Sequence, residues 1–341
     1  MTSTTPDRAA SLAARFTSDN SMPWVSTLNH LGQARTPCFF LLDFELRKPL
    51  IITNPDENTA LTRFSFPGRP DPIGVGKQPA IRFTPIPYER FHAAFEIVRA
   101  GLQRGDSFLT NLTFPTPVES QSNLQEIYAA TQSKYRVLVP GEFACFSPET
   151  FVTISGEGYI ETRPMKGTAA DSPQAIAALL NSSKEIAEHA TIVDLLRNDL
   201  SRVARGVSVT DYRYLERVER RDGGLVQTSS RIGGRLGKGW QARLGEILCE
   251  LLPAGSVSGA PKSATLDLIR RAEGQLRGYY CGIGGYFDGT ALDSCVLIRF
   301  IERVGEDLYF RSGGGITAYS DPVLEYDELN RKIRLPLKNP I

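Results

Sequence analysis

Short strand-like runs that occur in clusters, with helix-like segments between the clusters, limit the folds open to this chain more than any other feature. One cluster contains the runs "SFLTNLTFPTPV", "RVLVPGEFACFS" and "TFVTISGEGYIETRP". Helical segments follow over 173–200, where Ser182 and Glu185 form a Ser-x-x-Glu capping pattern. A second cluster leads to a last helix opened by Asp321 and Pro322. The pattern predicts an α+β fold of antiparallel sheet layers flanked by helices.

Charge and cysteine content argue against several classes of function. The 39 basic and 38 acidic residues give a formal charge of +1, which provides no electrostatic footprint for nucleic acid. The five scattered cysteines form no C-x-x-C pair, so we expect neither a disulfide framework nor a zinc site. No apolar run has the length of a signal-peptide core or of a membrane span. We therefore expect a cytoplasmic protein with no nucleic-acid or membrane partner.

An acidic constellation lies on the last helix. Glu325, Glu328 and Lys332 stand at i, i+3 and i+7 in "SDPVLEYDELNRK", on one helix face. Three glycines in the preceding "FRSGGGIT" leave backbone N–H groups open to an anion. Glu188, on the capped helix, is a further acidic candidate. Carboxylates from two helices suit Mg²⁺, while surface salt bridging is the plain alternative.

A glycine-rich loop, "PAGSVSGAPKSATLDLI", resembles a phosphate-binding loop but departs from it at one point. The phosphate-binding pattern needs glycine directly before the lysine, whereas Pro261 precedes Lys262 here and has no N–H to offer. Nucleotide binding is therefore a weak alternative, and the loop still suits a carboxylate at a helix start. Lys166, in "RPMKGT", is by itself most simply a solvated loop residue.

Eight motifs in order nevertheless resemble one family, the chorismate-utilising enzymes. They are "GDSFLTNLT", "FSPETF", "RPMKGT", "KEIAEHATIVDLLRNDLSRVARG", "AGSVSGAPK", "YYCGIGGY", "IRF" and "GGGITAYSDPVLEY". The family includes anthranilate synthase component I, aminodeoxychorismate synthase component I, isochorismate synthase and salicylate synthase. The resemblance implies a single large domain of two layered antiparallel β-sheets flanked by helices. Residues 1–90 would form a shortened N-terminal segment of that fold, and residues 91–341 its chorismate-binding catalytic core.

The resemblance also implies a set of site residues. Glu188 and Glu328, assisted by Glu325, would coordinate Mg²⁺, which holds the ring carboxylate of chorismate. Arg299 and Tyr280 match the residues that hold the enolpyruvyl carboxylate. Further substrate contacts would come from Gly167, Thr168, Ser258, Gly259, Gly314, Gly315 and Lys332.

Lys166 gains a role from the same resemblance. The anthranilate synthases carry alanine at this position, whereas the aminodeoxychorismate synthases carry lysine, as this chain does. The lysine would attack C2 of the ring as a covalent nucleophile, which requires a lowered pKa. Glu149 matches the general acid that protonates the departing C4 hydroxyl. Leu109 occupies the place of the water-activating lysine of isochorismate and salicylate synthases, which weakens both of those interpretations.

Three departures from the family pattern remain. Gln227 aligns with the family's catalytic-region histidine and cannot shuttle protons. The N-terminal third lacks a tryptophan-binding signature, so feedback inhibition by tryptophan is not expected. The chain has no amidotransferase segment, so a separate glutamine amidotransferase subunit would supply ammonia. The sequence thus favours 4-amination of chorismate for folate synthesis over 2-amination, and over a non-catalytic anion-binding role.

Overall fold

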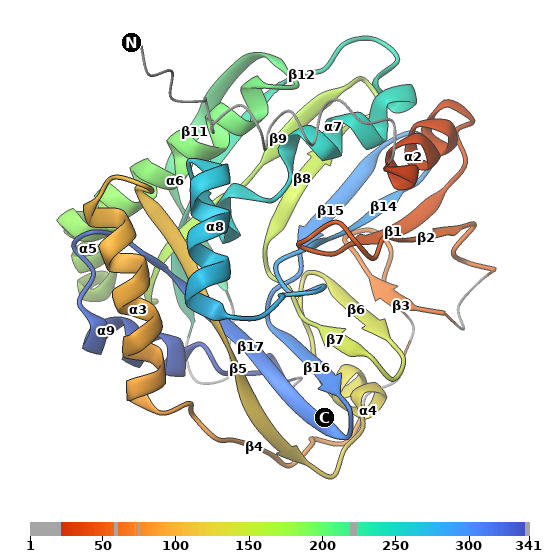
Figure 1. Cartoon of the computed structure of the whole chain (residues 1–341). Helices are drawn as coiled ribbons and strands as arrows, with labels where there is room; N and C mark the ends of the chain where they lie inside the picture. The colour runs from red at the N-terminus through yellow and green to blue at the C-terminus, as the bar shows by residue number, and fades with distance from the viewer. Residues whose placement is uncertain (1–21, 58–60, 72, 74–75, 219–223, 338–341) are drawn as a thin grey trace, which may run out of the picture.

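Two antiparallel β-sheets form the centre of the molecule, and helices cover their outer sides (Figure 1). The computed structural model describes residues 22–57, 61–71, 73, 76–218 and 224–337. Some consecutive strands form hairpins and others are joined by longer segments, so each sheet contains strands from distant parts of the chain. The predicted α+β class, with two layered antiparallel sheets, is confirmed.

The first sheet has nine strands, ordered β10-β12-β9-β8-β15-β14-β1-β2, with β11 paired to β12. β10 is the strand that carries "MKGTAA", at one end of this order. The strands are β1 (Cys38–Leu42), β2 (Leu50–Thr53), β8 (Thr150–Ile154), β9 (Tyr159–Thr162), β10 (Met165–Ala170), β11 (Arg205–Val218), β12 (Leu225–Arg235), β14 (Ile283–Phe287) and β15 (Leu292–Val296).

The second sheet has eight strands, ordered β13-β5-β17-β16-β7-β6-β3, with β4 paired to β5. Its long pair β5 and β17 runs in register from Val118 opposite Leu308 to Thr110 opposite Ile316. The strands are β3 (Arg63–Ser65), β4 (Ile81–Phe83), β5 (Leu109–Ser120), β6 (Arg136–Val139), β7 (Phe143–Cys145), β13 (Gly259–Ala260), β16 (Phe300–Val304) and β17 (Asp307–Ile316).

Helices flank the sheets in groups. Helix α6 packs on β10, β11 and β12, α8 packs on α3 and β5, and α9 packs on β17. None of the helices that the structure describes is long and apolar enough to cross a membrane. The helices are α2 (Pro23–Gln33), α3 (Tyr88–Gln103), α4 (Leu124–Ala130), α5 (Pro173–Asn181), α6 (Ser183–Ser201), α7 (Leu244–Leu251), α8 (Lys262–Glu273) and α9 (Pro322–Arg331), with short 3₁₀ turns η1 (Trp240–Arg243) and η2 (Gly255–Val257).

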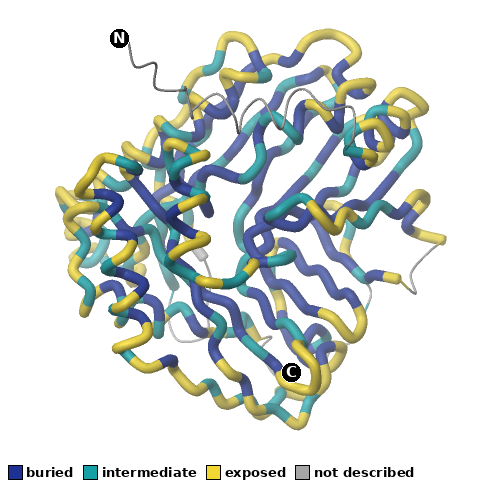
Figure 2. The backbone as a smooth tube through the Cα atoms, in the orientation of Figure 1, coloured by how far each residue is buried: buried dark blue, intermediate teal, exposed yellow. Residues whose placement is uncertain are grey.

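The largest core lies between the two sheets, where Figure 2 shows the strands almost wholly buried. Phe39 of β1 stacks on Phe64 of β3 with ring centroids 4.0 Å apart, which joins the two sheets. A second core fills the space between α3, α8 and β5. Side chains at helical spacing on α3, such as Phe91, Phe95 and Val98, supply it. This second core also includes Ile316 of β17 and Leu329 of α9, so it holds α3, α8, α9, β5 and β17 together.

Candidate active site

Lys166 and Glu188 join strand β10 to helix α6. Lys166 precedes a β-bulge at Gly167, where the backbone takes a φ of +77°. Ser182 is the N-cap of helix α6, and its hydroxyl accepts a hydrogen bond from the Glu185 amide, which is the serine half of the predicted capping box. Lys166 Nζ donates to Glu188 Oε2 over 2.9 Å. The two side chains are only 27% and 20% exposed, so they form a largely buried ion pair.

The pKa of Lys166 differs from the expectation raised by the sequence. Burial lowers the pKa of Lys166, but the charges of Glu188, Glu328 and Glu185 outweigh burial and leave that pKa raised. The expectation of a lowered pKa is therefore wrong for this arrangement, in which Glu188 is turned toward the lysine. The ammonium has to part from Glu188 before its nitrogen can act as a nucleophile.

All three carboxylates predicted to bind a metal ion lie beside ammonium groups. Glu328 pairs with Lys332 at 2.7 Å. Glu325 is nearly buried, and its Oε1 lies 3.9 Å from Lys184 Nζ. The same ammonium lies 3.7 Å from Glu188 Oε1. Helices α6 and α9 thus bring their carboxylates to one acidic cluster, which we define as Glu185, Glu188, Glu325 and Glu328.

The acidic cluster has the donor chemistry of a Mg²⁺ site. In their present rotamers, the described residues offer no group of three or more His, Cys, Asp or Glu side chains placed to hold a metal ion. Burial, together with the charges of Glu328 and Glu188, raises the pKa of Glu325. Burial and the Glu188 charge also raise the pKa of Glu185. Because Mg²⁺ favours a few carboxylate oxygens, such a cation suits this crowded set, and metal binding by the three residues stays a prediction.

Glu149 lies just before β8 and is held by a neighbouring loop. Ser256 Oγ, from η2, donates to Glu149 Oε1 over 2.5 Å. Burial raises the pKa of Glu149, against the opposing effects of the Ser256 bond and the Lys166 charge. A carboxyl group with a raised pKa keeps its proton closer to neutral pH, as a general acid must. Sequence reasoning missed Ser256, because nothing in "AGSVSGAPK" separates its two serines.

Two glycines of β17 lie close to the ammonium groups. A methyl group built on Gly315 would lie 3.1 Å from Leu109 Cδ1 and 3.8 Å from Lys166 Nζ. One built on Gly314 would lie 3.6 Å from Lys332 Nζ and 3.8 Å from Glu325 Oε2. Both glycines therefore lie near Lys166 and the acidic cluster, and their contact with substrate stays a prediction.

Two other predicted glycines are required by close packing. A methyl group on Gly167 would meet Glu185 Oε2 at 2.6 Å. Gly259 has a φ of +135°, and a methyl group there would lie 1.8 Å from the Leu109 carbonyl oxygen. Both positions need glycine for the fold itself, whatever they contact in a complex.

Arg299 stands directly before β16 in an unusual backbone conformation. Its φ is +56°, in the left-handed region that residues other than glycine seldom adopt. Its guanidinium donates to the Lys332 carbonyl, and its charge lowers the pKa of Glu149. Arg299 thus lies close enough to act electrostatically on Glu149, and its contact with the enolpyruvyl carboxylate stays a prediction.

Tyr280 borders a buried ion pair that sequence reasoning missed. Arg277 pairs with Glu273 at 2.6 Å, with both side chains essentially unexposed. Arg277 also donates to the carbonyls of Val257 and Asn111, each over 2.7 Å, which ties η2 to β5. Burial raises the pKa of Tyr280, whose electrostatic neighbours include Arg277 and Glu273. The i, i+4 spacing of that pair is the sequence signal that could have revealed it.

Ser258 and Thr168 have less direct placements. The Ser258 hydroxyl is buried and donates to the Ala254 carbonyl over 2.8 Å, inside its own loop. Thr168 is exposed and lies opposite Gln227 in the β10–β12 register. The Gln227 amide donates to Glu216 Oε2 over 3.3 Å. Substrate contact by Ser258 and Thr168 stays a prediction.

Lys262, from the loop that resembles a phosphate-binding loop, is tied to the interior. Its Nζ donates to the Leu251 carbonyl over 2.7 Å and pairs with Asp199 at 2.9 Å. Only 17% of the lysine side chain is exposed. These contacts hold α6, α7 and α8 together and speak against a role for Lys262 in binding nucleotide phosphates.

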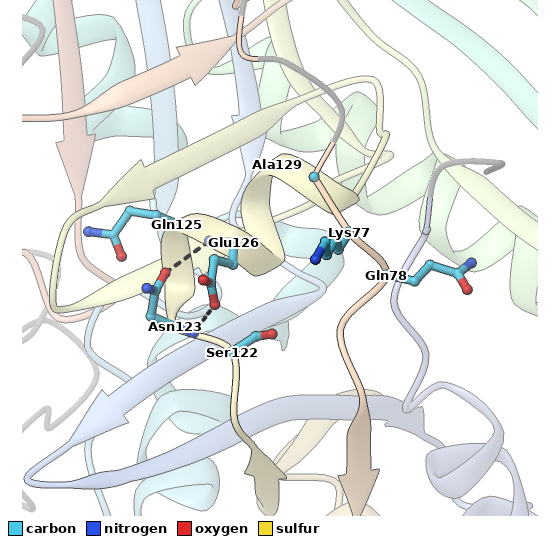
Figure 3. Close-up of a pocket in the computed structure, with 8 residues that line it drawn as sticks. Lys77, Gln78, Ser122, Asn123, Gln125, Glu126 and Ala129 are labelled. Atoms are coloured by element: carbon cyan, nitrogen blue, oxygen red, sulfur yellow. Dashed lines mark hydrogen bonds between the residues drawn. The ribbon is translucent and has the colours of Figure 1, made fainter. Parts of the chain in front are cut away.

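A surface pocket lies apart from these residues (Figure 3). It is lined by the start of α4 and by the segment around Lys77 and Gln78. Asn123 and Glu126 form the reciprocal capping box that begins α4. The polar groups of the pocket thus serve the helix end, and none of the predicted site residues lines it.

Comparison with known proteins gives one consistent family. The model of the family described as chorismate binding enzyme matches residues 33–338. A protein of Haemophilus influenzae, named uncharacterized PabA-like protein, is 45% identical over 326 residues, which cover 92% of this chain and 97% of the relative.

Relatives with named activities are more distant and differ from one another. Aminodeoxychorismate synthase component 1 of Bacillus subtilis is 31% identical, over 73% of this chain and 55% of the relative. The crystal structure of anthranilate synthase component I from Streptococcus pneumoniae superposes with a TM-score of 0.63 and 29% identity, over 78% of this chain and 61% of the other. The two similarities, at 31% and 29% identity, do not distinguish between the two named activities.

Proposed function

This chain belongs to the chorismate binding enzyme family, and on that premise we propose that it is the chorismate-aminating component of an aminodeoxychorismate synthase. The proposed reaction converts chorismate and ammonia into 4-amino-4-deoxychorismate and water. The observation that carries this proposal is Lys166, whose Nζ lies beside Glu188 and close to Gly315 of β17.

Lys166 is the proposed nucleophile. Its neutral amine attacks C2 of the ring, the ring double bonds shift, and the C4 hydroxyl leaves. Ammonia then attacks C4, the double bonds shift back, and the bond between C2 and the lysine nitrogen breaks. The lysine nitrogen sheds one proton after it attacks and takes one back when it leaves. The ammonia nitrogen sheds one proton after it attacks C4, and this proton replaces the one that the general acid gave to the departing hydroxyl. Chorismate thus exchanges hydroxyl for amine, water is released and the enzyme is restored.

Glu149 is the proposed general acid. The C4 hydroxyl is a poor leaving group as hydroxide and leaves readily as water, so it needs a proton during the first step. Burial raises the pKa of Glu149, and the Ser256 hydroxyl fixes the orientation of its carboxyl group. The charge of Lys166 acts on the same carboxyl group, which supports a common site for the nucleophile and the acid.

The anionic groups of chorismate have matching cations. Arg299 offers a planar guanidinium suited to the enolpyruvyl carboxylate, with Tyr280 as its predicted companion. Glu188, Glu328 and Glu325 would hold Mg²⁺, which supplies a positive charge for the ring carboxylate. Lys332, paired with Glu328, would lie next to that carboxylate.

Ammonia is proposed to come from a separate glutamine amidotransferase subunit, because the chain contains no segment recognisable as an amidotransferase. The nearest rival function is 2-amination, the first step toward anthranilate. It rests on the similarity to the anthranilate synthase structure and is disfavoured by Lys166, since direct attack of ammonia at C2 needs no lysine at that place.

One experiment separates these functions. The full chain is incubated with chorismate, Mg²⁺ and ammonium, and the product is identified by mass and by its conversion with a lyase specific for aminodeoxychorismate. We expect 4-amino-4-deoxychorismate. Accumulation of anthranilate would replace the proposal with 2-amination, and isochorismate release without ammonia would mean that water is activated despite Leu109.

A further inference from the structure

Lys184 is a charged residue of the candidate site that the proposed reaction leaves without a role. It stands in the first turn of α6, and its side chain is 55% exposed. Its Nζ lies 3.7 Å from Glu188 Oε1 and 3.9 Å from Glu325 Oε1. One ammonium therefore lies between carboxylates of two different helices, α6 and α9.

Helix stability does not explain a lysine at this position. A positive charge in the first turn opposes the helix dipole, which favours acidic residues there. The pair with Glu188 also has lysine on the N-terminal side, which is the weaker orientation of an i, i+4 pair. Both distances exceed the roughly 3.2 Å of a good N–H···O hydrogen bond, so neither carboxylate holds the ammonium tightly.

The negative charges of the acidic cluster explain why a lysine stands at position 184. Glu325 is only 6% exposed, and its neighbours Glu188 and Glu328 add like charge. The Lys184 charge opposes this repulsion at Glu325 and at Glu185. The exposed stem of Lys184 leaves the ammonium free to swing toward solvent when another cation takes its place.

We propose that Lys184 is an exchangeable counter-cation of the acidic cluster. Together with Lys166, which pairs with Glu188 at 2.9 Å, it offsets the charges of Glu188 and Glu325 in the metal-free chain. It also competes with the divalent cation for these two carboxylates. The inference rests on the proposed function insofar as Glu188 and Glu325 are taken as metal ligands. By this competition Lys184 weakens metal binding to the free chain and keeps the cluster stable without a metal ion.

Metal binding to the full chain, without chorismate, tests the proposal. Mn²⁺ replaces Mg²⁺ as the probe, and free Mn²⁺ is measured by electron paramagnetic resonance at low ionic strength. Removing one positive charge about 4 Å from the ligands should tighten Mn²⁺ binding about tenfold in Lys184→Gln. Lys184→Arg, which keeps the charge, should bind Mn²⁺ as the parent does, and added salt should narrow the difference.

A matched control removes the same charge elsewhere. Lys238 is exposed in the turn between β12 and η1, so Lys238→Gln should leave the Mn²⁺ affinity unchanged. A second readout is the melting temperature, which should fall in Lys184→Gln without metal and recover with saturating Mn²⁺, because the metal then supplies the missing charge.

The outcomes distinguish this proposal from the proposed function. Equal or weaker Mn²⁺ binding by Lys184→Gln, with binding lost in Glu188→Gln, would overturn the counter-cation role and leave the metal ligands standing. Absence of Mn²⁺ binding in the parent would overturn both the role and the metal assignment. Formation of anthranilate in the product assay would overturn the proposed 4-amination alone, since it does not involve the competition at the acidic cluster.

Discussion

Two lysine–carboxylate pairs in this molecule have the same length and different surroundings. Lys166 and Glu188 lie 2.9 Å apart, as do Lys262 and Asp199. Burial lowers the pKa of Lys262 despite its partner, and burial raises that of Asp199. The pKa of Lys166 is instead raised, because further carboxylates add to the effect of Glu188. At Lys262 the contact thus joins one lysine to one carboxylate, whereas at Lys166 further carboxylates surround the ion pair.

The further carboxylates mark the Lys166 pair as part of a site. Lys262 also donates to the Leu251 carbonyl, so its contacts hold α6, α7 and α8 together. Glu188 is instead shared between Lys166 and Lys184. A carboxylate with two competing ammonium partners can release either one at modest cost. We expect Glu188 to exchange one lysine partner for another and Asp199 to keep Lys262. The predictions below test this difference.

The largest effect is expected from Lys166 itself. Lys166→Ala should reduce formation of the 4-amino product on the order of 10³-fold or more and abolish any covalent adduct. Without ammonia, the parent should accumulate an adduct with the chorismate skeleton on the peptide that contains "PMKGT", seen by intact-protein and peptide mass. Lys166→Arg should fail as well, because guanidinium stays protonated. Full activity in Lys166→Ala would overturn the nucleophile assignment and leave this lysine only its structural ion pair with Glu188.

The stability of the fold should depend more on Lys262 than on Lys166, which is the reverse of the expectation for catalytic activity. Lys262→Met leaves Asp199 buried without its partner, which should cost about 3–5 kcal/mol in the free energy of unfolding. Lys166→Met also removes one partner of a largely buried pair, but the loss should be smaller than in Lys262→Met, since Glu188 keeps Lys184 as a second partner. Urea unfolding followed by fluorescence measures both. A larger loss in Lys166→Met than in Lys262→Met would remove the distinction between the two pairs.

The sequence predicts local features of this arrangement better than it predicts contacts between segments that are distant in the chain. The capping of α6 by Ser182 and of α9 by Asp321 depends on neighbours in the chain, and both caps are present as predicted. The pairing of Lys166 with Glu188 depends on how β10 meets α6, which no local pattern specifies. The expectation of a lowered pKa at Lys166 failed for this reason, because it considered only the lysine's own motif.

A smaller effect concerns the pKa of Lys166. Glu188 raises this pKa, so Glu188→Gln should lower it. The amine fraction at a fixed pH then increases, and acetylation of Lys166 should become faster. Peptide mass spectrometry after acetic anhydride treatment across a pH series measures both lysines in one sample. Lys262, whose Asp199 partner is unchanged, should keep its acetylation rate. A slower or equal acetylation rate at Lys166 would contradict the conclusion that Glu188 raises the pKa of Lys166.

The smallest effect extends the comparison to Glu149, which feels the Lys166 charge. Ser256 donates to the ionised carboxylate and so lowers the pKa of Glu149, against the larger effect of burial. Ser256→Ala removes this donor, so the pKa of Glu149 should rise further and the protonated form should persist to higher pH. Infrared difference spectra during a pH titration follow the carbonyl stretch of the protonated carboxyl group, and Glu149→Gln identifies its band. Lys166→Met should shift the same midpoint upward, because it removes a positive charge, whereas Lys262→Met should leave it in place. If both lysine variants move the midpoint equally, Glu149 does not belong to the field of Lys166, and the proposed pairing of acid and nucleophile fails.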